Sequence, residues 1–307
     1  VPGVVDIRPK ALSRGRLHKP GTSNISRTMN KRKPGSGNYS RTETPAKPFR
    51  GGGGRGPRHG PQKGHKGGAD ENFLYGFHAV TAALQNPERK VLRLLMTRNA
   101  ENEMADEGLS LGTQLAITPE TMTGEEIAAH LPPGAVHQGI ALKVSALPDL
   151  SVDEACEGVN VAVVLDQVTD PHNFGAILRS AAVFGAGALI ATDRNSPPLG
   201  GALAKAASGA LEQVRVAKVT NLVRALDELK DLGFEVIGLD GEGEVSLPDF
   251  KTGPKVAIVM GAEGTGLRRL TREHCDILAR LPAFGPMKSL NVSNAAAVAL
   301  YELSRRR

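Results

Sequence analysis

Short apolar runs that each end at a polar turn mark the second half of the chain. They have the length of buried strands and carry few polar side chains. Apolar positions at helical spacing follow the first run, and they return in the Ala-rich stretch 294–304. This alternation of strands and helices predicts an α/β domain over residues 160–307. The apolar runs are residues 161–165, 188–191 and 256–260.

A smaller α/β unit is predicted over residues 71–147, where helical periodicity alternates with short apolar runs. This unit shows no catalytic constellation. Residues 148–159 contain Pro148, Ser151 and four acidic side chains, so we predict an exposed linker between the two units. The predicted helices of the small unit are 75–84, 101–111 and 124–130, and its predicted strands are 91–96, 115–118 and 140–144.

Residues 1–70 have almost no apolar periodicity and are rich in Gly, Pro and Arg, which predicts a disordered tail. They hold 16 Lys or Arg and 3 Asp or Glu, a net charge of +13, whereas the rest of the chain holds 22 and 29, a net charge of −7. Such a basic segment can bind the phosphate backbone of RNA. The alternative interpretation is a solvated spacer. Met29, followed by Asn-Lys-Arg-Lys, is a candidate for the translation start. On that interpretation, residues 1–28 are not part of the protein in the cell.

The composition argues against several classes of protein. The apolar content of 40% can supply two cores, but no stretch approaches about eighteen consecutive apolar residues, so no membrane span is predicted. Cys156 and Cys275 form no CxxC pair, and the eight histidines show no metal-ligand spacing. We therefore expect a cytoplasmic protein with reduced thiols, no metal and no membrane partner.

The first polar segment that suggests chemistry is DPHNFGAILRSA, residues 170–181, directly after the first predicted strand. Open α/β sheets place ligands at the carboxyl ends of their strands. On a helix that begins near Asn173, the polar groups of Asn173, Arg179 and Ser180 would project from neighbouring positions and allow a shared site. The alternative makes Asn173 a helix N-cap and Arg179 a solvated helix residue.

The second segment is VMGAEGTGL, residues 259–267, in which three glycines enclose the carboxylate of Glu263. Glycines permit a positive φ and a close approach of the backbone to a ligand. No Gly-Lys-Ser/Thr follows, so the segment is not a phosphate loop, and taken alone it is weak evidence of a site.

The third segment is LPAFGPMKSLNVSNAAA, residues 281–297, directly before an Ala-rich helix. One Ser or Asn would satisfy the first free N–H groups of a helix that begins near Val292. The segment carries more polar groups than that, which suggests a binding surface. The alternative is a doubly capped C-terminal helix.

Together and in this order, the three segments resemble the SpoU (TrmH-like) family of RNA ribose 2′-O-methyltransferases in the SPOUT superfamily. The resemblance covers about residues 161–307 and implies a trefoil-knotted α/β catalytic domain, S-adenosyl-L-methionine as the methyl donor and a homodimer formed through the C-terminal helix. The family's motifs are matched by Asn173, Gly175 and Arg179, then by Gly261, Glu263 and Gly266, and finally by Pro282, Gly285, Ser289, Leu290, Asn291 and Ser293.

The small unit also resembles part of this family. YGFHAV, residues 75–80, and HQGIAL, residues 137–142, are similar to the amino-terminal substrate-binding domain of the members that act on ribosomal RNA, whose fold is similar to a ribosomal protein. His137 and Gln138 would contact RNA on this reading, and a turn between helix and strand explains them equally well.

The chemistry suggests roles for the polar matched residues and for those at the cofactor. A ribose hydroxyl is a poor nucleophile, whereas a sulfonium methyl is already activated, so the protein must align the two and stabilise alkoxide charge. A guanidinium keeps its proton, so Arg179 would grip the neighbouring phosphate and stabilise the 2′-oxygen. Asn173 would orient Arg179 or the ribose, Ser289 and Asn291 would support the same centre, and Glu263 would hold Arg179 or bind the nucleotide. The cofactor would lie against Gly261, Leu281, Gly285, Leu290 and Ser293.

The sequence therefore predicts methylation of a ribose in RNA, with a guanosine of the 23S (large-subunit) ribosomal RNA as the expected target. A transfer RNA ribose methyltransferase and a non-catalytic ribosome assembly factor are the alternatives. Loss of chemistry would show as substitution at Asn173, Arg179 or the Ser289 and Asn291 pair, and none is substituted. A Rossmann-type methyltransferase is disfavoured, because Gly185-Ala-Gly187 follows a helix and ends it.

Overall fold

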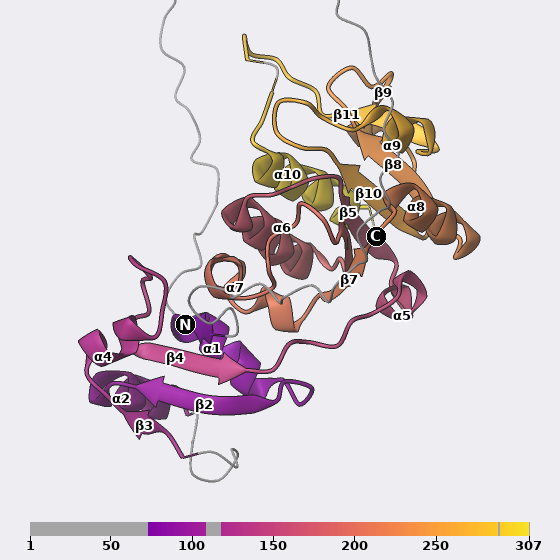
Figure 1. Ribbon diagram of the computed structural model, residues 1–307. Coiled ribbons are helices and arrows are strands. Elements are labelled where there is room, and N and C mark those ends of the chain that lie inside the picture. The colour runs from indigo at the N-terminus through magenta and orange to yellow at the C-terminus, as the bar shows by residue number, and fades with distance from the viewer. Residues whose placement is uncertain (1–72, 109–117, 288, 307) are drawn as a thin grey trace, which may run out of the picture. The chain divides into compact units, whose positions relative to one another are not determined.

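The computed structural model describes residues 73–108, 118–287 and 289–306 (Figure 1). The predicted tail and most of the predicted strand at 115–118 lie outside the described residues. The described part of the chain forms two sheets, one of four strands in the order β1-β4-β2-β3 and one of seven in the order β7-β6-β5-β10-β8-β11-β9.

The four-stranded sheet is mostly antiparallel, since β4 pairs antiparallel with β1 and β2 while β3 pairs parallel with β2. Tyr75 ends a strand rather than beginning a helix as predicted, because Gly76 turns the chain with a φ of 86°. The elements are β1 (Phe73–Tyr75), α1 (Phe77–Gln85), β2 (Val91–Met96), α2 (Arg98–Asp106), β3 (Glu120–Thr121), α4 (Gly124–Ala129) and β4 (Ile140–Val144).

Every pairing in the seven-stranded sheet is parallel. The predicted α/β class is confirmed, with a parallel sheet at its centre. The sequence analysis made no prediction for β7, β8, β9 or β11. The strands are β5 (Val161–Leu165), β6 (Ala188–Thr192), β7 (Arg215–Val219), β8 (Glu235–Leu239), β9 (Val245–Ser246), β10 (Val256–Met260) and β11 (Ile277–Arg280).

Helices cover both faces of this sheet. In β5, Val163 and Leu165 belong to the same buried cluster as α6 and α10, whereas Ala162 and Val164 belong to the cluster of α5 and α8. This burial on two sides explains why β5, β6 and β10 are continuous apolar runs. The helical elements are α5 (Val152–Cys156), α6 (Pro171–Phe184), α7 (Gly201–Ala207), η1 (Ala210–Glu212), α8 (Leu222–Asp231), η2 (Leu247–Asp249), α9 (Arg269–Glu273) and α10 (Val292–Ser304).

The exposed linker predicted at residues 148–159 is wrong in its central part. Ser151 forms a capping box with Glu154 and starts helix α5, in which Val152, Ala155 and Cys156 are buried. These three side chains pack in the cluster of α8. The composition suggested a linker because the acidic residues occupy the solvent side of a short amphipathic helix.

Gly175 allows α6 and α7 to pack closely. A Cβ added at this position would lie 2.6 Å from the Cβ of Ala206 and 2.6 Å from the carbonyl oxygen of Leu203. Such distances are well inside van der Waals contact, so any side chain at this position would force the helices apart. The glycine of the first segment is therefore explained by packing.

The described residues show no group of three His, Cys, Asp or Glu side chains able to hold a metal ion. Within the same residues, no helix has the length and apolar character to cross a membrane. Burial raises the pKa of the Cys156 thiol to about 11 and that of Cys275 to about 12. Both cysteines are free and stay protonated at neutral pH, which makes them poor nucleophiles.

Candidate active site

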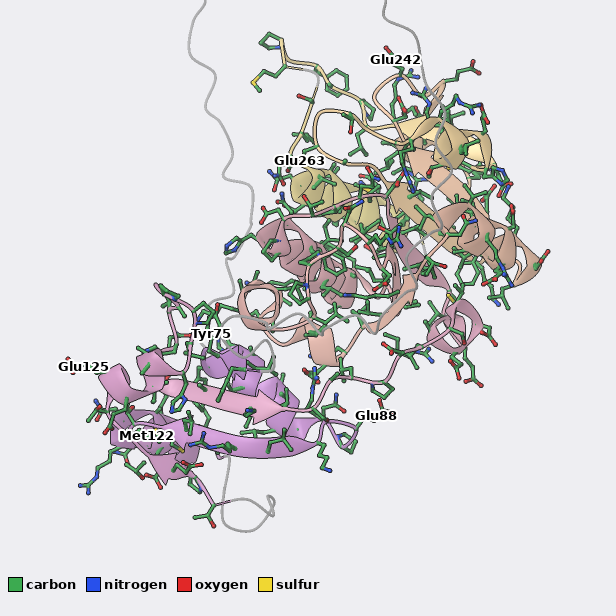
Figure 2. All side chains as sticks on the ribbon, viewed as in Figure 1. Tyr75, Glu88, Met122, Glu125, Glu242 and Glu263 are labelled. Atoms are coloured by element: carbon green, nitrogen blue, oxygen red, sulfur yellow. The ribbon has the colours of Figure 1, made fainter. Side chains whose placement is uncertain are left out.

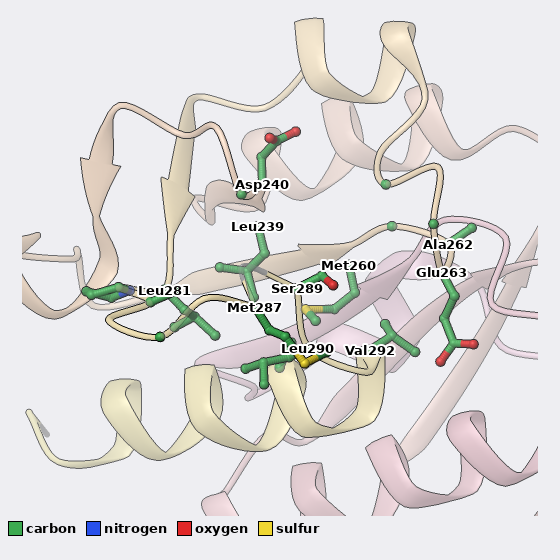
Figure 3. Close-up of a pocket in the computed structure, with 18 of the residues that line it drawn as sticks. Leu239, Asp240, Met260, Ala262, Glu263, Leu281, Met287, Ser289, Leu290 and Val292 are labelled. Atoms are coloured by element: carbon green, nitrogen blue, oxygen red, sulfur yellow. The ribbon is translucent and has the colours of Figure 1, made fainter. Parts of the chain in front are cut away.

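A cavity of about 500 Å³ opens at the carboxyl ends of β8, β10 and β11 (Figure 3). Its walls are largely apolar. In the view of Figure 3, the side chains of Met260, Ser289 and Leu290 lie between those of Leu281 and Glu263. Among the described lining residues, the only charged side chains are the carboxylates of Asp240 and Glu263, which favour a cationic ligand over an anionic one.

The loop between β10 and α9 folds back on itself to form one wall. Ala262 and Gly266 exchange backbone hydrogen bonds of 3.1 and 2.9 Å. A Cβ at Gly261 would lie only 2.2 Å from the carbonyl carbon of Gly266. Gly261 is therefore required for the closure of the loop itself, whatever binds beside it.

Asn173, Glu263 and Asn291 join the three predicted segments through their side chains. The Nδ2 of Asn173 donates to the Oε1 of Glu263 at 2.8 Å, and the Nδ2 of Asn291 donates to the same oxygen at 2.6 Å. Asn291 Nδ2 also approaches the Oδ1 of Asn173 at 3.1 Å. The structure thus brings together three residues that the sequence analysis proposed as one site, and Figure 2 marks Glu263 near the start of α10.

The capping of α6 and α10 leaves the side-chain NH2 groups of Asn173 and Asn291 available for Glu263. Asp170 caps α6 by accepting the N–H of His172 at 3.0 Å, so Asn173 is not the N-cap that the alternative reading required. Asn291 does cap α10, but through its Oδ1, which accepts the N–H of Ser293 at 2.9 Å. Its Nδ2 remains available for Glu263, so one asparagine serves both the helix and the site.

Arg179 does not join this cluster within the chain. It is exposed on α6 and has no hydrogen bond or ion pair to any described residue, and Glu263 is held by the two asparagines instead. Six residues of helix separate it from Asn173, a rotation of about 240° around the axis. The expectation that Glu263 holds Arg179 is therefore wrong for a single chain. Ser180, in contrast, has a partner, because its hydroxyl donates to the carbonyl oxygen of Ala176 at 3.0 Å.

Of the predicted cofactor residues, Gly261, Leu281, Gly285 and Leu290 line the cavity, and so does Ser289. Ser293 is not among the lining residues, because it lies in the first turn of α10 with its N–H bonded to Asn291. The sequence analysis missed the segment 239–241 at the end of β8, which also lines the cavity. The signal was present as an apolar run, 236–239, that ends at Asp-Gly.

His137 and Gln138 take part in a turn before β4. His137 Nδ1 accepts the N–H of Gly139 at 3.1 Å. Gln138, with a φ of 56°, accepts the N–H of Phe77 at 3.2 Å and a hydrogen bond from Lys205. These contacts support the turn interpretation of both residues.

The chain matches two family profiles. That of the SpoU rRNA Methylase family covers residues 160–301, and that described as RNA 2′-O ribose methyltransferase substrate binding covers residues 73–150. A 23S rRNA (guanosine-2′-O-)-methyltransferase RlmB of Pseudomonas syringae pv. tomato is 41% identical over 242 residues, which are 76% of this chain and 95% of that protein. The chain belongs to the SpoU rRNA methylase family.

Other family members give the same picture. The RlmB protein of Ralstonia nicotianae is 42% identical over 241 residues, covering 76% of this chain and 96% of that protein. The solved structure of the SpoU methyltransferase AviRb from Streptomyces viridochromogenes, in complex with AdoMet, superposes with a TM-score of 0.65 at 22% identity and covers 76% of this chain and 89% of that one. That likeness supports the fold of the SpoU domain.

As a member of the SpoU family, the protein is an RNA 2′-O-methyltransferase and uses S-adenosylmethionine as methyl donor. The cavity at β8, β10 and β11 fits this cofactor. Its apolar walls suit an adenine ring, its main-chain groups at 261, 281–285 and 289–290 offer hydrogen bonds, and its two carboxylates suit the positive sulfonium.

Proposed function

We propose that this protein methylates the 2′-hydroxyl of a guanosine in 23S ribosomal RNA. The observation that carries the proposal is identity of about 40% to RlmB proteins along 95–96% of their length. The intact cluster of Asn173, Glu263 and Asn291 supports a catalytic member over a non-catalytic assembly factor. Since its target belongs to the ribosome, we expect the enzyme to work in the cytoplasm.

The substrate is tested by incubating the full chain with labelled S-adenosylmethionine and either unmethylated 23S ribosomal RNA or transfer RNA, then mapping the methylated nucleotide. We expect the label on the ribose of one guanosine of the 23S RNA. Preferential labelling of transfer RNA would support the other enzymatic alternative. Binding of 23S RNA without any transfer of label would instead support the assembly factor.

We assign the cavity of about 500 Å³ to the cofactor, which supplies an activated methyl group when bound. Leu281 and Leu290 would pack on the adenine, and Glu263 would lie near the sulfonium end. The free Oε2 of Glu263 has no protein partner in the described residues, so it can accept a hydrogen bond from a ribose hydroxyl. Ser289, which lines the same cavity, is the second polar side chain that we assign to the RNA ribose.

Gly285→Val tests the cofactor assignment. A Cβ at Gly285 meets no protein atom within 4 Å, so the variant should fold and place its bulk on the rim of the cavity. We expect the affinity for S-adenosylmethionine, measured by calorimetry, to fall about tenfold, or about 1.4 kcal/mol. Gly253→Val is the control, since that exposed glycine precedes β10 at the other end of the strand. If wild type and Gly285→Val bind S-adenosylmethionine with equal affinity, the loop that contains Gly285 is not part of the cofactor site.

We further propose a homodimer through α6 and α10. These helices pack on each other and leave exposed an apolar patch of Val183, Val298 and Tyr301, with exposed fractions of 70%, 43% and 48%. Ala299 and Leu303 of α10 are buried within the chain, so they are not part of this proposed contact. The patch, and not the core face of α10, is the proposed contact.

The dimer would give Arg179 its role. Arg179 and Val183 are four residues apart, so they share one face of α6. An interface through Val183 would carry Arg179 towards the partner chain, where its guanidinium can stabilise the developing 2′-oxyanion without giving up its proton. Light scattering at micromolar concentration should show a dimer, and Val298→Glu should weaken it. A monomeric wild type would contradict both the dimer and the shared site.

We propose that the SpoU region is knotted, as its family implies. Strand β8 lies between β10 and β11, so the chain must cross β8 after leaving β10. Residues 281–285, 287, 289 and 290 then line the same cavity as Gly261, at the carboxyl end of β10, before α10 begins. A knot requires such a crossing and return, because one segment of the chain must pass through a loop formed by another.

We assign residues 71–147 to recognition of the RNA, residues 160–307 to methyl transfer, and the basic tail to nonspecific affinity. The profile match at residues 73–150 supports the first assignment. The net charge of +13 in residues 1–70 supports the last, because phosphate contacts release counterions.

A further inference from the structure

A second cavity, of about 520 Å³, lies at the carboxyl ends of β5, β6 and β7. It shares no lining residue with the cofactor cavity. Residues from the ends of β5 and β6, the first turn of α8 and the segment 268–271 form its walls. We call it the arginine pocket, after Arg194, Arg268 and Arg269, which line it.

Two hydroxyl groups in the arginine pocket are buried without a partner. Thr192 is 7% exposed and Thr271 is 1% exposed, and the Oγ1 of each lacks a hydrogen-bond partner among the described residues. Leaving a buried hydroxyl unpaired costs stability, and native proteins rarely do so without a reason. Two such groups lining one cavity point to a ligand that accepts hydrogen bonds there.

The pocket has a net positive charge, although Arg269 is paired with Glu273 at 2.6 Å, and this charge favours an anion. None of its described lining residues is acidic. Arg268 donates through Nε to Asp166 at 2.6 Å, and that is the one hydrogen bond of its guanidinium to a described residue, while Arg194 is exposed and pairs with no described residue. Asp166 is fully buried and fixes Arg268, so this guanidinium is held in place before any ligand arrives.

The first turn of α8 adds backbone donors. Asn221 caps this ten-residue helix by accepting the N–H of Arg224 at 3.3 Å. Leu222 and Val223, whose N–H groups have no acceptor within the helix, both line the pocket. The partial positive charge of a helix N-terminus favours phosphate at this position.

We propose that the arginine pocket binds a backbone phosphate of the RNA substrate. This inference rests on the proposed function. Strands β5 and β10 are neighbours, so the pocket and the cofactor cavity open at the same edge of one sheet. One RNA strand can therefore reach both, with a phosphate in the arginine pocket fixing the register of the ribose that is methylated.

The test uses the full chain and an in-vitro transcript of 23S ribosomal RNA, with affinities measured by filter binding at several KCl concentrations. Arg194→Ala should weaken binding about tenfold and reduce the slope of log K against log salt by about 0.7–0.9, the value for one lost phosphate contact. Thr192→Val should also weaken binding about tenfold, because a hydroxyl-to-phosphate hydrogen bond is lost, without lowering the melting temperature. Affinity for S-adenosylmethionine should stay unchanged in both.

Lys251→Ala is the matched control, because it removes one exposed positive charge before β10, at the opposite edge of the sheet. It should leave the salt slope as in wild type. Wild-type affinity and slope in both Arg194→Ala and Thr192→Val would overturn the proposal.

A measurement with inorganic phosphate distinguishes a free phosphate ion from a phosphate of the RNA backbone as the ligand of the pocket. If phosphate raises the melting temperature of wild type but the variants bind RNA normally, the pocket takes a free anion and the RNA assignment is overturned. The pocket and the proposed function can also fail separately. Loss of RNA affinity in the variants supports the pocket even if wild type methylates another RNA, and unaffected variants overturn it even if wild type methylates 23S RNA.

Discussion

Arg179→Ala will lower the methylation rate by about a hundredfold or more, the scale of removing one donor that stabilises charge in the transition state. Arg179 does not line the cofactor cavity, so the affinity for S-adenosylmethionine should hardly change. Single-turnover transfer of labelled methyl to 23S RNA measures the first effect and calorimetry the second. Arg179→Lys keeps the charge but loses the planar fork, so it should recover part of the rate. Full activity in Arg179→Ala would refute the role of this side chain.

A mixed dimer tests whether Arg179 acts in the partner's site. Arg179→Ala and Asn291→Ala should each be inactive alone. When the two chains are mixed, one of the two sites combines an intact Arg179 from one chain with the intact amide and carboxylate cluster of the other, so activity should return. If Arg179 instead serves its own chain, every site in the mixed dimer lacks one residue and no activity will appear.

Glu212→Ala will lower the free energy of unfolding by about 3–5 kcal/mol, because it leaves a buried charge without its partner. Arg89 and Glu212 are joined by two hydrogen bonds, of 3.1 and 2.6 Å, and their side chains are only 1% and 4% exposed. Asn86 donates to the same carboxylate at 2.7 Å and would lose this bond as well. Urea denaturation of the full chain measures the effect.

Glu120→Ala is the matched control for Glu212→Ala. Arg93 and Glu120 are also joined by two hydrogen bonds, of 2.8 and 2.7 Å, but their side chains are 38% and 41% exposed. Water can solvate the arginine that remains, so we expect a loss of at most about 1 kcal/mol. Equal losses in the two variants would show that burial does not determine the cost of breaking these pairs.

The pair of Arg89 and Glu212 also has a structural consequence. It joins the segment after α1 to η1, which follows α7. Replacing both residues by apolar side chains of similar size, as in Arg89→Met with Glu212→Leu, should recover much of the stability lost in Glu212→Ala, because the desolvation of both charges is then avoided. This double variant separates the loss of a contact from the burial of a lone charge.

The sequence by itself determined the class of the fold and the family. Strands β5, β6 and β10 could be predicted because a parallel strand buried on both faces is apolar at nearly every position, and each carries five buried residues, of which only Thr192 in β6 is polar. The three polar segments stood out because they interrupt this pattern at the ends of strands, where turn residues and hydrogen-bonding groups are constrained by local geometry. Those constraints act within about ten residues, so the sequence displays them directly.

The tertiary structure alone decided how these segments meet. Asn173, Glu263 and Asn291 are 90, 28 and 118 residues apart in pairs, and no local pattern indicates that one carboxylate oxygen receives both amides. The separation of Arg179 from that cluster, the burial of α5 and the unpaired hydroxyls of Thr192 and Thr271 likewise depend on which elements become neighbours in the folded chain. Contacts between distant segments arise from packing of the whole sheet with its helices. Local sequence patterns do not indicate which distant segments become neighbours.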